Sequence, residues 1–185
     1  MTTPLDILNA APRDRAIAMM APLVECSPWV VERVVDARPF ASAQALSSAL
    51  AGTIAAADVE RQRVLFSAHP ELAGREAAEG RMTEASTGEQ HRLGLLALLP
   101  ADARRLADLN RRYRARFGHP FIVALHRFED LPSLFAAFER RLAASPSEEH
   151  AATLAEIASV IRARTARAFG PGPDVQAHPA AATLE

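Results

Sequence analysis

The sequence predicts an all-α fold, a single-domain helical bundle with one short extended buried segment near residues 119–125. Helix start and stop signals recur along the chain, whereas the alternating patterns of strands are nearly absent. The 185 residues are enough for one ordinary domain with a full hydrophobic core. No internal repeat is visible, so we expect residues 1–170 to form one helical domain.

Small polar residues and proline mark the helix starts in the first half of the chain. The Ser27-Pro28 pair combines an N-cap with a proline at the first helical position. Ser42 is expected to cap a further helix that Gly52 interrupts, and Asp58 to start a helix that runs toward Phe66. The first half of the chain is therefore predicted to be a series of short helices.

Longer helices are expected in the second half. Pro100 and Asp102 open a helix that reaches Arg116, and Gly118 is placed to end it. Residues 130–142 have apolar side chains at helical spacing, which predicts an amphipathic helix.

The last helix has the clearest start signal. Ser145 and Glu148 form a capping box with a proline between them, and the helix is expected to fade near Phe169. Residues 171–185 have too little apolar content to pack, so they are expected to form a disordered tail.

Residues 117–125 depart from the helical pattern. They contain a glycine, a proline and a β-leaning apolar run that is too short for a helix, and His119 is pushed toward extended geometry by Pro120. An extended segment buried in a helical bundle leaves backbone N–H and C=O groups that need partners. A polar ligand is one possible partner; the alternative is a linker through the core whose partners are side chains or water.

The composition excludes several kinds of chemistry. All 21 basic residues are arginine, and Cys26 is the only cysteine. A lysine Schiff base, a lysine-anchored pyridoxal phosphate and a thiolate metal cluster are therefore excluded. A lone cysteine suits a reducing cytosol, and we expect Cys26 to be a small buried apolar residue. No secretory signal or membrane span is apparent, so the protein is expected to be cytoplasmic.

Four polar residues between positions 69 and 90 have no obvious structural purpose. His69 precedes Pro70, so its backbone is expected to be extended at the end of a helix. The side chain is either a proton donor or a capping or core histidine. Ser86, Glu89 and Gln90 are spaced to share one helix face. The alternative is that Ser86 is an N-cap and Glu89 its capping-box partner.

Arg164 is the least expected charged residue. It lies three, four and seven positions after Ile161, Val160 and Ile157, so it continues their apolar stripe into the core. A buried arginine needs an anionic partner, either Glu89 or a bound carboxylate. The alternative is that its stem packs while its charged end reaches the solvent.

Two further kinds of site are not favoured. The histidines include no pair at the i, i+4 spacing of a helical zinc site, so no metal is expected. The basic run at residues 111–116 is one that nucleic-acid-binding proteins use. The net charge of the chain is only -1, however, which favours a solvated helix face. We therefore expect neither a nucleic-acid nor a membrane partner.

Considered together, the motifs of this chain resemble the 2-oxo-4-hydroxy-4-carboxy-5-ureidoimidazoline (OHCU) decarboxylases of urate degradation. The resemblance covers most of the chain, and its specificity comes from the order and spacing of the motifs. They are Leu8-Asn9, Ser27-Pro28-Trp29, Arg38-Pro39-Phe40, residues 69–74, residues 86–90, Leu109-Asn110 to Tyr113, residues 117–122, Glu156-Ile157 and Arg164.

The resemblance implies an all-helical homodimeric lyase that makes (S)-allantoin without a cofactor or metal. It implies that His69 donates a proton, and that Glu89 and Arg164 complete the catalytic set. The substrate-binding positions that it implies are Pro70, Ser86, Thr87, Gly88, Glu89, Gln90, Phe121, Ile122, Val123, Ala124 and Leu125. One departure is His119, where a second phenylalanine is expected; it puts the identity of the substrate in question.

Two alternatives remain at this point. A non-catalytic helical module that binds a small anion or a partner helix would keep the apolar stripes and Arg164, but would not need His69 and Glu89 in one pocket. A metal-dependent hydrolase that uses the histidines is the other, and a metal assay would separate it.

Overall fold

The computed structural model describes residues 2–74, 77, 79–80 and 82–170, and the regular structure in these residues is entirely helical. The α-helices are α1 (Pro4–Ala10), α2 (Arg13–Met20), α3 (Pro28–Val34), α4 (Ala43–Ala55), α5 (Val59–Ser67), α7 (Glu84–Arg92), α8 (Pro100–Phe117), α9 (Leu131–Leu142) and α10 (Pro146–Phe169). Three 3-10 turns, η1 (Ala21–Leu23), η2 (Val35–Ala37) and η3 (Leu125–Arg127), link them. The predicted all-α fold is confirmed, and the predicted tail at 171–185 lies outside the described residues.

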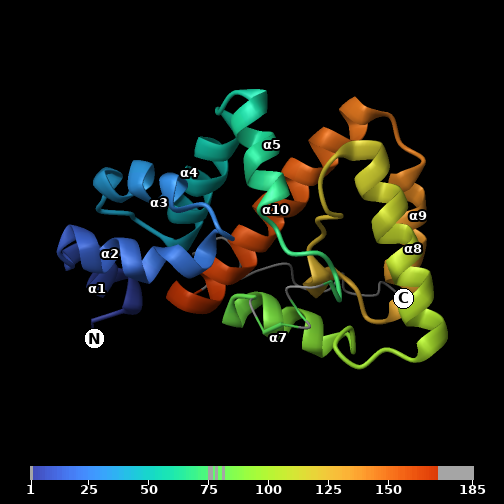
Figure 1. The fold of residues 1–185 in the computed structure, drawn as a ribbon. Helices are drawn as coiled ribbons and strands as arrows, with labels where there is room; N and C mark the ends of the chain where they lie inside the picture. The colour runs from blue at the N-terminus through green and yellow to red at the C-terminus, as the bar shows by residue number, and fades with distance from the viewer. Residues whose placement is uncertain (1, 75–76, 78, 81, 171–185) are drawn as a thin grey trace, which may run out of the picture.

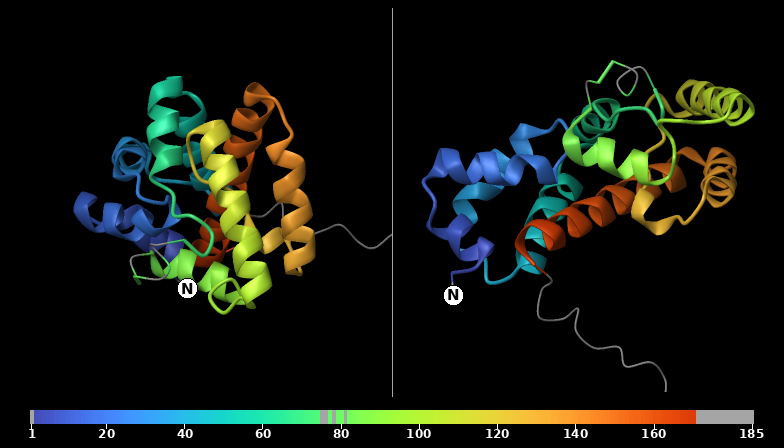
Figure 2. Two further views of the ribbon diagram at one scale, coloured as in Figure 1. Left: turned by 45° about the vertical axis from the view of Figure 1, so that its right-hand side comes forward. Right: turned by 90° about the horizontal axis from the view of Figure 1, so that it is seen from below.

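Helix α10 runs through the middle of the molecule. Helices α1–α5 lie on one side of it, α8 and α9 on the other, and α7 lies across the base (Figure 1). The view from below shows α10 extending from the N-terminal helices to the α8–α9 pair (Figure 2). Its most extensive contacts are with α4. No helix in the described ranges has the length and apolar content needed to cross a membrane.

The apolar interior has two parts. The first core cluster joins α1–α5 to α10, and its largest side chains include Met20, Leu46 and Phe66. The second core cluster lies between α8 and α9 and includes Tyr113 and Phe138. Helix α10 contributes apolar side chains to the first cluster only, and it meets the second through polar contacts of Glu149 with Tyr113 and Arg141.

Most of the expected helix starts are present. Helix α3 begins directly after Ser27, although the Ser27 side chain makes no capping hydrogen bond. Ser42 caps α4 as expected, and Ser145 and Glu148 form the expected capping box at α10. The predicted break at Gly52 is wrong, since α4 continues through it to Ala55. Burial of one face of α4 against α10 outweighs the cost of about 1 kcal/mol for a glycine in a helix.

The expectation for Cys26 is also wrong. Its side chain is exposed, because it lies in the turn after η1 with a φ of 46°. In this turn the neighbouring Glu25 takes the buried position, with 5% of its surface exposed.

The extended segment is present where it is predicted. Gly118 ends α8 with a φ of 80°, and residues 119–124 are then buried without forming a helix or strand. Side chains alternate along extended backbone, so Ile122 packs in the first core cluster while Phe121 and Val123 pack in the second. The segment therefore connects the two parts of the core.

Candidate active site

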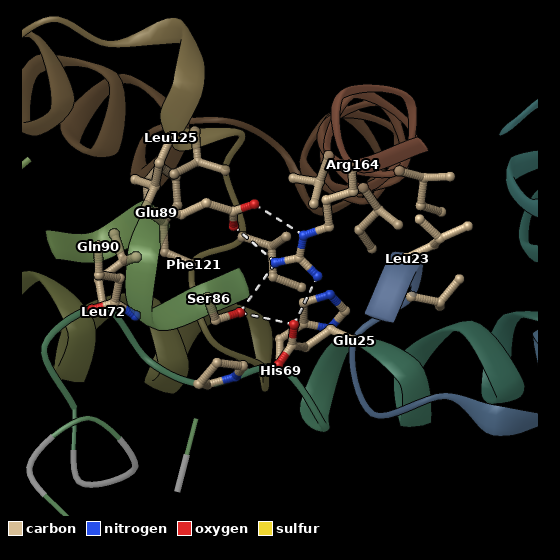
Figure 3. Close-up of a pocket in the computed structure, with 17 residues that line it drawn as sticks. Leu23, Glu25, His69, Leu72, Ser86, Glu89, Gln90, Phe121, Leu125 and Arg164 are labelled. Atoms are coloured by element: carbon tan, nitrogen blue, oxygen red, sulfur yellow. Dashed lines mark hydrogen bonds and ion pairs between the residues drawn. The ribbon is translucent and has the colours of Figure 1, made fainter. Parts of the chain in front are cut away.

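A partly open cavity of about 570 Å³ lies where the two core clusters meet. Its mixture of an apolar wall and a few polar groups is typical of small-molecule sites. Figure 3 shows the side chains around it. They are Leu23, Val24, Glu25, His69, Pro70, Leu72, Ser86, Glu89, Gln90, Phe121, Ile122, Val123, Leu125, Ile157, Val160, Ile161 and Arg164.

Helix α7 presents three of the predicted polar residues to the cavity. Its N-cap is Thr83, whose hydroxyl accepts from the backbone N–H of Ser86 at 3.2 Å. The alternative in which Ser86 caps the helix is therefore wrong. Because Ser86 lies inside the first turn, it shares a face with Glu89 and Gln90, and all three line the cavity.

Arg164 is buried, with 6% of its surface exposed, and it enters the cavity from α10. Its Nε and Nη2 donate to the two carboxylate oxygens of Glu89 at 2.9 and 2.8 Å. The Arg164 Nη1 donates to Glu25 at 2.9 Å, and Nη2 also donates to Ser86 at 3.1 Å (Figure 3). A contact of 3.4 Å to the Pro22 carbonyl uses the fifth N–H group, so the guanidinium has all its donors engaged.

Glu25 is the residue that sequence reasoning missed. Its carboxylate accepts from the hydroxyls of Ser86 at 2.8 Å and Thr83 at 2.9 Å, as well as from Arg164. Burial acts to raise the pKa of Glu25, but the Arg164 charge and these hydrogen bonds lower it below its ordinary value. The opposing charges of Glu25 and Glu89 raise the pKa of Arg164 against the effect of burial.

These pKa directions indicate that Glu25 and Arg164 are both charged at neutral pH. The Arg164 guanidinium therefore lies between the carboxyl groups of Glu25 and Glu89. The anionic partners of Arg164 are thus Glu89, as the sequence allowed, and Glu25, which it did not indicate.

His69 follows the end of α5 and is partly buried. Its Nδ1 lies 2.9 Å from the Leu65 carbonyl oxygen, and a carbonyl only accepts, so Nδ1 carries a proton. Burial lowers the pKa of His69 below 6.5, which leaves the ring neutral at pH 7. Nε2 is then unprotonated, and it has no hydrogen-bond partner among the described residues. A proton acceptor thus borders the cavity beside Glu25 and Arg164 (Figure 3).

Gln90 is almost fully buried and holds the loop that follows Pro70. Its side-chain oxygen accepts from the Ala73 N–H at 2.8 Å, and its nitrogen lies 3.5 Å from the Glu71 carbonyl. This arrangement fixes Pro70 and Leu72 at the rim of the cavity.

Three of the predicted substrate-binding residues do not line the cavity. Thr87 and Gly88 are exposed elsewhere on α7, and the Thr87 hydroxyl donates to the Thr83 carbonyl instead. Ala124 is buried, and its N–H donates to Glu156 at 2.8 Å. The other predicted positions all border the cavity: Pro70, Ser86, Glu89, Gln90, Phe121, Ile122, Val123 and Leu125.

His119 lies behind the cavity wall. It is buried, its Nδ1 is 2.8 Å from the Pro120 carbonyl, and its ring contacts Phe66 and Tyr113 edge-on. It therefore fills the place of an aromatic core residue. In the part of the chain that the structure describes, no three His, Cys, Asp or Glu side chains are grouped so that they would hold a metal ion.

Comparison with protein families gives one matching model, described as OHCU decarboxylase, over residues 9–166. A relative from Haloferax volcanii named 2-oxo-4-hydroxy-4-carboxy-5-ureidoimidazoline decarboxylase is 35% identical over 165 residues. The alignment covers 89% of this chain and 95% of the relative.

Two solved structures have a similar fold. A crystal structure of (S)-allantoin synthase superposes with a TM-score of 0.69 at 20% identity, covering 89% of this chain and 54% of that chain. A crystal structure of OHCU decarboxylase in the presence of (S)-allantoin gives a TM-score of 0.63 at 18% identity, covering 78% of this chain and 93% of the other.

Proposed function

The chain belongs to the OHCU decarboxylase family, and from this premise we propose that it decarboxylates OHCU to (S)-allantoin in urate degradation. The observation that carries the proposal is the cavity in which His69, Glu89 and Arg164 meet apolar side chains. A non-catalytic anion-binding module is less well supported, because the Arg164 donors are already bound to Glu25 and Glu89.

The substrate carries its own electron sink. Breaking the bond between ring carbon 4 and the carboxylate releases neutral CO₂, and the adjacent carbon–nitrogen double bond accepts the electron pair. The 4-hydroxyl group loses its proton as it becomes a carbonyl, while ring carbon 5 and the ring nitrogen each gain one. The reaction consumes one proton overall, so the protein needs to bind the substrate, exclude water and direct a proton to one face.

We assign the directed proton transfer to His69. Neutral His69 can accept the 4-hydroxyl proton at Nε2 and then deliver it to ring carbon 5. The Nδ1–H bond to the Leu65 carbonyl fixes the ring while this happens. The sequence suggested a general acid; the lowered pKa means that the acid must first be formed by taking up a proton.

Glu89 and the backbone of residues 121–125 are suited to the polar edges of the substrate. The Glu89 carboxylate is held on two points by Arg164, and its remaining lone pairs can accept ureido N–H groups. Since Arg164 has its donors engaged, we place the leaving carboxylate against the apolar wall that includes Leu23 and Ile161. Loss of charge as CO₂ forms is favoured in such surroundings.

We further propose that the reaction needs no metal or cofactor, since the substrate supplies the electron sink. The test is to add purified protein to freshly generated urate-oxidation intermediates and follow allantoin by circular dichroism, with and without a chelator. Faster formation of one enantiomer in both samples is expected. An unchanged rate would contradict the decarboxylase assignment, and loss with a chelator that zinc reverses would contradict metal independence.

A homodimer in the cytosol is proposed as the working form. The exposed apolar side chains Val59 and Val64 of α5 support an association surface on that helix. Sedimentation of the purified protein tests the dimer, and a monomer at working concentrations would contradict it. The lone cysteine supports a reducing compartment.

A further inference from the structure

A second group of buried charged and polar side chains lies behind the cavity wall and is not used by the proposed reaction. It consists of Tyr113, Arg141, Glu149 and Thr153, which we term the buried ion cluster. None is more than 8% exposed. Arg141 and Glu149 form an ion pair, in which the Arg141 Nε donates to Glu149 at 3.0 Å. Tyr113 donates its hydroxyl to Glu149, and Thr153 accepts from Arg141 at 3.0 Å.

Arg141 connects this cluster to the cavity wall at two adjacent residues. Its Nη1 donates to the Ile122 carbonyl at 2.6 Å. Its guanidinium carbon lies 4.8 Å from the centroid of the Phe121 ring, a cation–π contact. Both Phe121 and Ile122 line the cavity, whereas Arg141 does not.

A purely stabilising role explains this arrangement poorly. A buried ion pair seldom stabilises a protein more than apolar side chains of the same size would, because desolvation offsets the attraction. A guanidinium does provide several rigidly arranged donors, and here one of them meets a backbone carbonyl that has no strand or helix partner. The buried ion cluster thus provides the hydrogen-bond donor that the Ile122 carbonyl needs, and it fixes the extended segment from the side behind the cavity wall.

We propose that Arg141 is a positioning residue that fixes the Phe121–Ile122 wall for substrate binding. Glu149 of α10 holds its guanidinium in place through the ion pair and the bond from Nε. The N–H groups of Ile122 and Val123 have no partner among the described residues, so the backbone that Arg141 anchors keeps donors for a ligand. The proposal rests on the proposed function insofar as that ligand is the substrate or (S)-allantoin.

The test compares variants that remove the anchor with variants that perturb only the cluster. Arg141→Met/Glu149→Gln removes both charges together, so no unpaired charge remains. Tyr113→Phe and Thr153→Val are the controls, since each removes a hydroxyl while Arg141 can still reach Ile122. Three quantities are measured: the Kd of (S)-allantoin, KM against kcat, and amide hydrogen exchange at residues 121–125.

The double variant is expected to bind (S)-allantoin at least roughly 10-fold more weakly, the value of a lost charge-assisted hydrogen bond. Its KM should rise more than its kcat falls, and amides 121–125 should exchange faster at an unchanged melting temperature. The controls should keep their affinity within about twofold, a change that is small beside a lost hydrogen bond.

Equal affinity in the double variant and the parent, with unchanged exchange, would overturn the proposal. So would an equal loss in the controls, because the cluster would then support the fold in general. If the double variant does not fold, Arg141→Lys gives the same comparison: its single ammonium cannot span Glu149 and the Ile122 carbonyl together, so faster exchange at 121–125 is expected. Unchanged exchange in that variant would overturn the proposal. Exchange does not depend on activity, so an inactive parent would refute only the proposed function.

Discussion

His69 shows how one backbone contact determines the chemistry of a side chain. The Leu65 carbonyl requires a proton on Nδ1, and burial keeps the ring neutral, so Nε2 is available to accept a proton. His69→Asn should preserve the fold, since Asn is similar in size and also forms hydrogen bonds. We expect the chemical step to slow by roughly 10²–10⁴-fold. In a single-turnover measurement, a folded variant within about threefold of the parent rate would show that the proton is handled elsewhere.

The pH profile follows from the lowered pKa of His69. Neutral His69 is the form that accepts the 4-hydroxyl proton, so kcat/KM should be level near pH 7 and fall as the pH drops below the His69 pKa, which lies under 6.5. A rate that rises on acidification would instead indicate that the histidine is charged before the substrate binds. The inflection should disappear in His69→Asn, which serves as the control.

Arg164 organises the site through the planar shape of its guanidinium as well as through its charge. Arg164→Lys retains the charge but cannot bind both Glu89 oxygens and Glu25 at once. We expect the free energy of unfolding to fall by roughly 1–3 kcal/mol. The activity should fall by a larger fraction than the free energy of unfolding does. Arg167→Lys is the matched control, since Arg167 is exposed on the same helix and should change stability by less than about 0.5 kcal/mol. Equal melting temperatures for the two variants would contradict this role.

Single residues also show the limit of sequence reasoning at the site. Arg164 was found because it interrupts a stripe of apolar residues on a regular helix. Glu25 offers no such periodicity, since it lies in a turn and its partner Arg164 is 139 positions away in the chain. Only the tertiary fold brings these two side chains together.

Among the elements, the ends of helices were more predictable than their interiors. Caps are local, and Ser42, Asp58 and Ser145 all cap helices as expected, whereas Ser27 precedes a helix without a side-chain capping bond. The wrong expectation of a break at Gly52 arose because propensity ignores the face that α4 buries against α10. Helix α7 was misjudged at its start for a related reason: Thr83 and Ser86 are both good caps, and the choice between them depends on what each contacts.

Two glycines, one at the end of a helix and one inside a helix, test whether helix ends and helix interiors depend on different factors. Gly118 ends α8 in the left-handed region and starts the segment that forms the cavity wall, so Gly118→Ala should cost roughly 1–2 kcal/mol. Gly52 lies inside α4 with open space where a Cβ would be, so Gly52→Ala should stabilise by about 0.5–1 kcal/mol. Denaturant midpoints measure both, and a shift of the same sign in the two variants would contradict the assignment.

For the whole molecule, the position of the cavity follows from the division of the core. The cavity lies between the two core clusters, and the segment at 121–125 belongs to both through alternate side chains. Its extended geometry was predictable from Pro120 and from the apolar run that is too short for a helix. The partners of its backbone, Arg141 and Glu156, were not predictable, because they come from helices that only the folded chain brings near.

The division of the core also gives each half its own optical reporter. The only tryptophan, Trp29, packs against the first core cluster beneath Arg61, and the only tyrosine, Tyr113, is buried in the second. Tryptophan fluorescence therefore follows the melting of the N-terminal helices, while tyrosine absorbance follows the α8–α9 half. Because the cavity needs both halves, (S)-allantoin should raise both transition midpoints together. A ligand that raises one transition midpoint and leaves the other unchanged would be bound within a single half, and not in the cavity between the two core clusters.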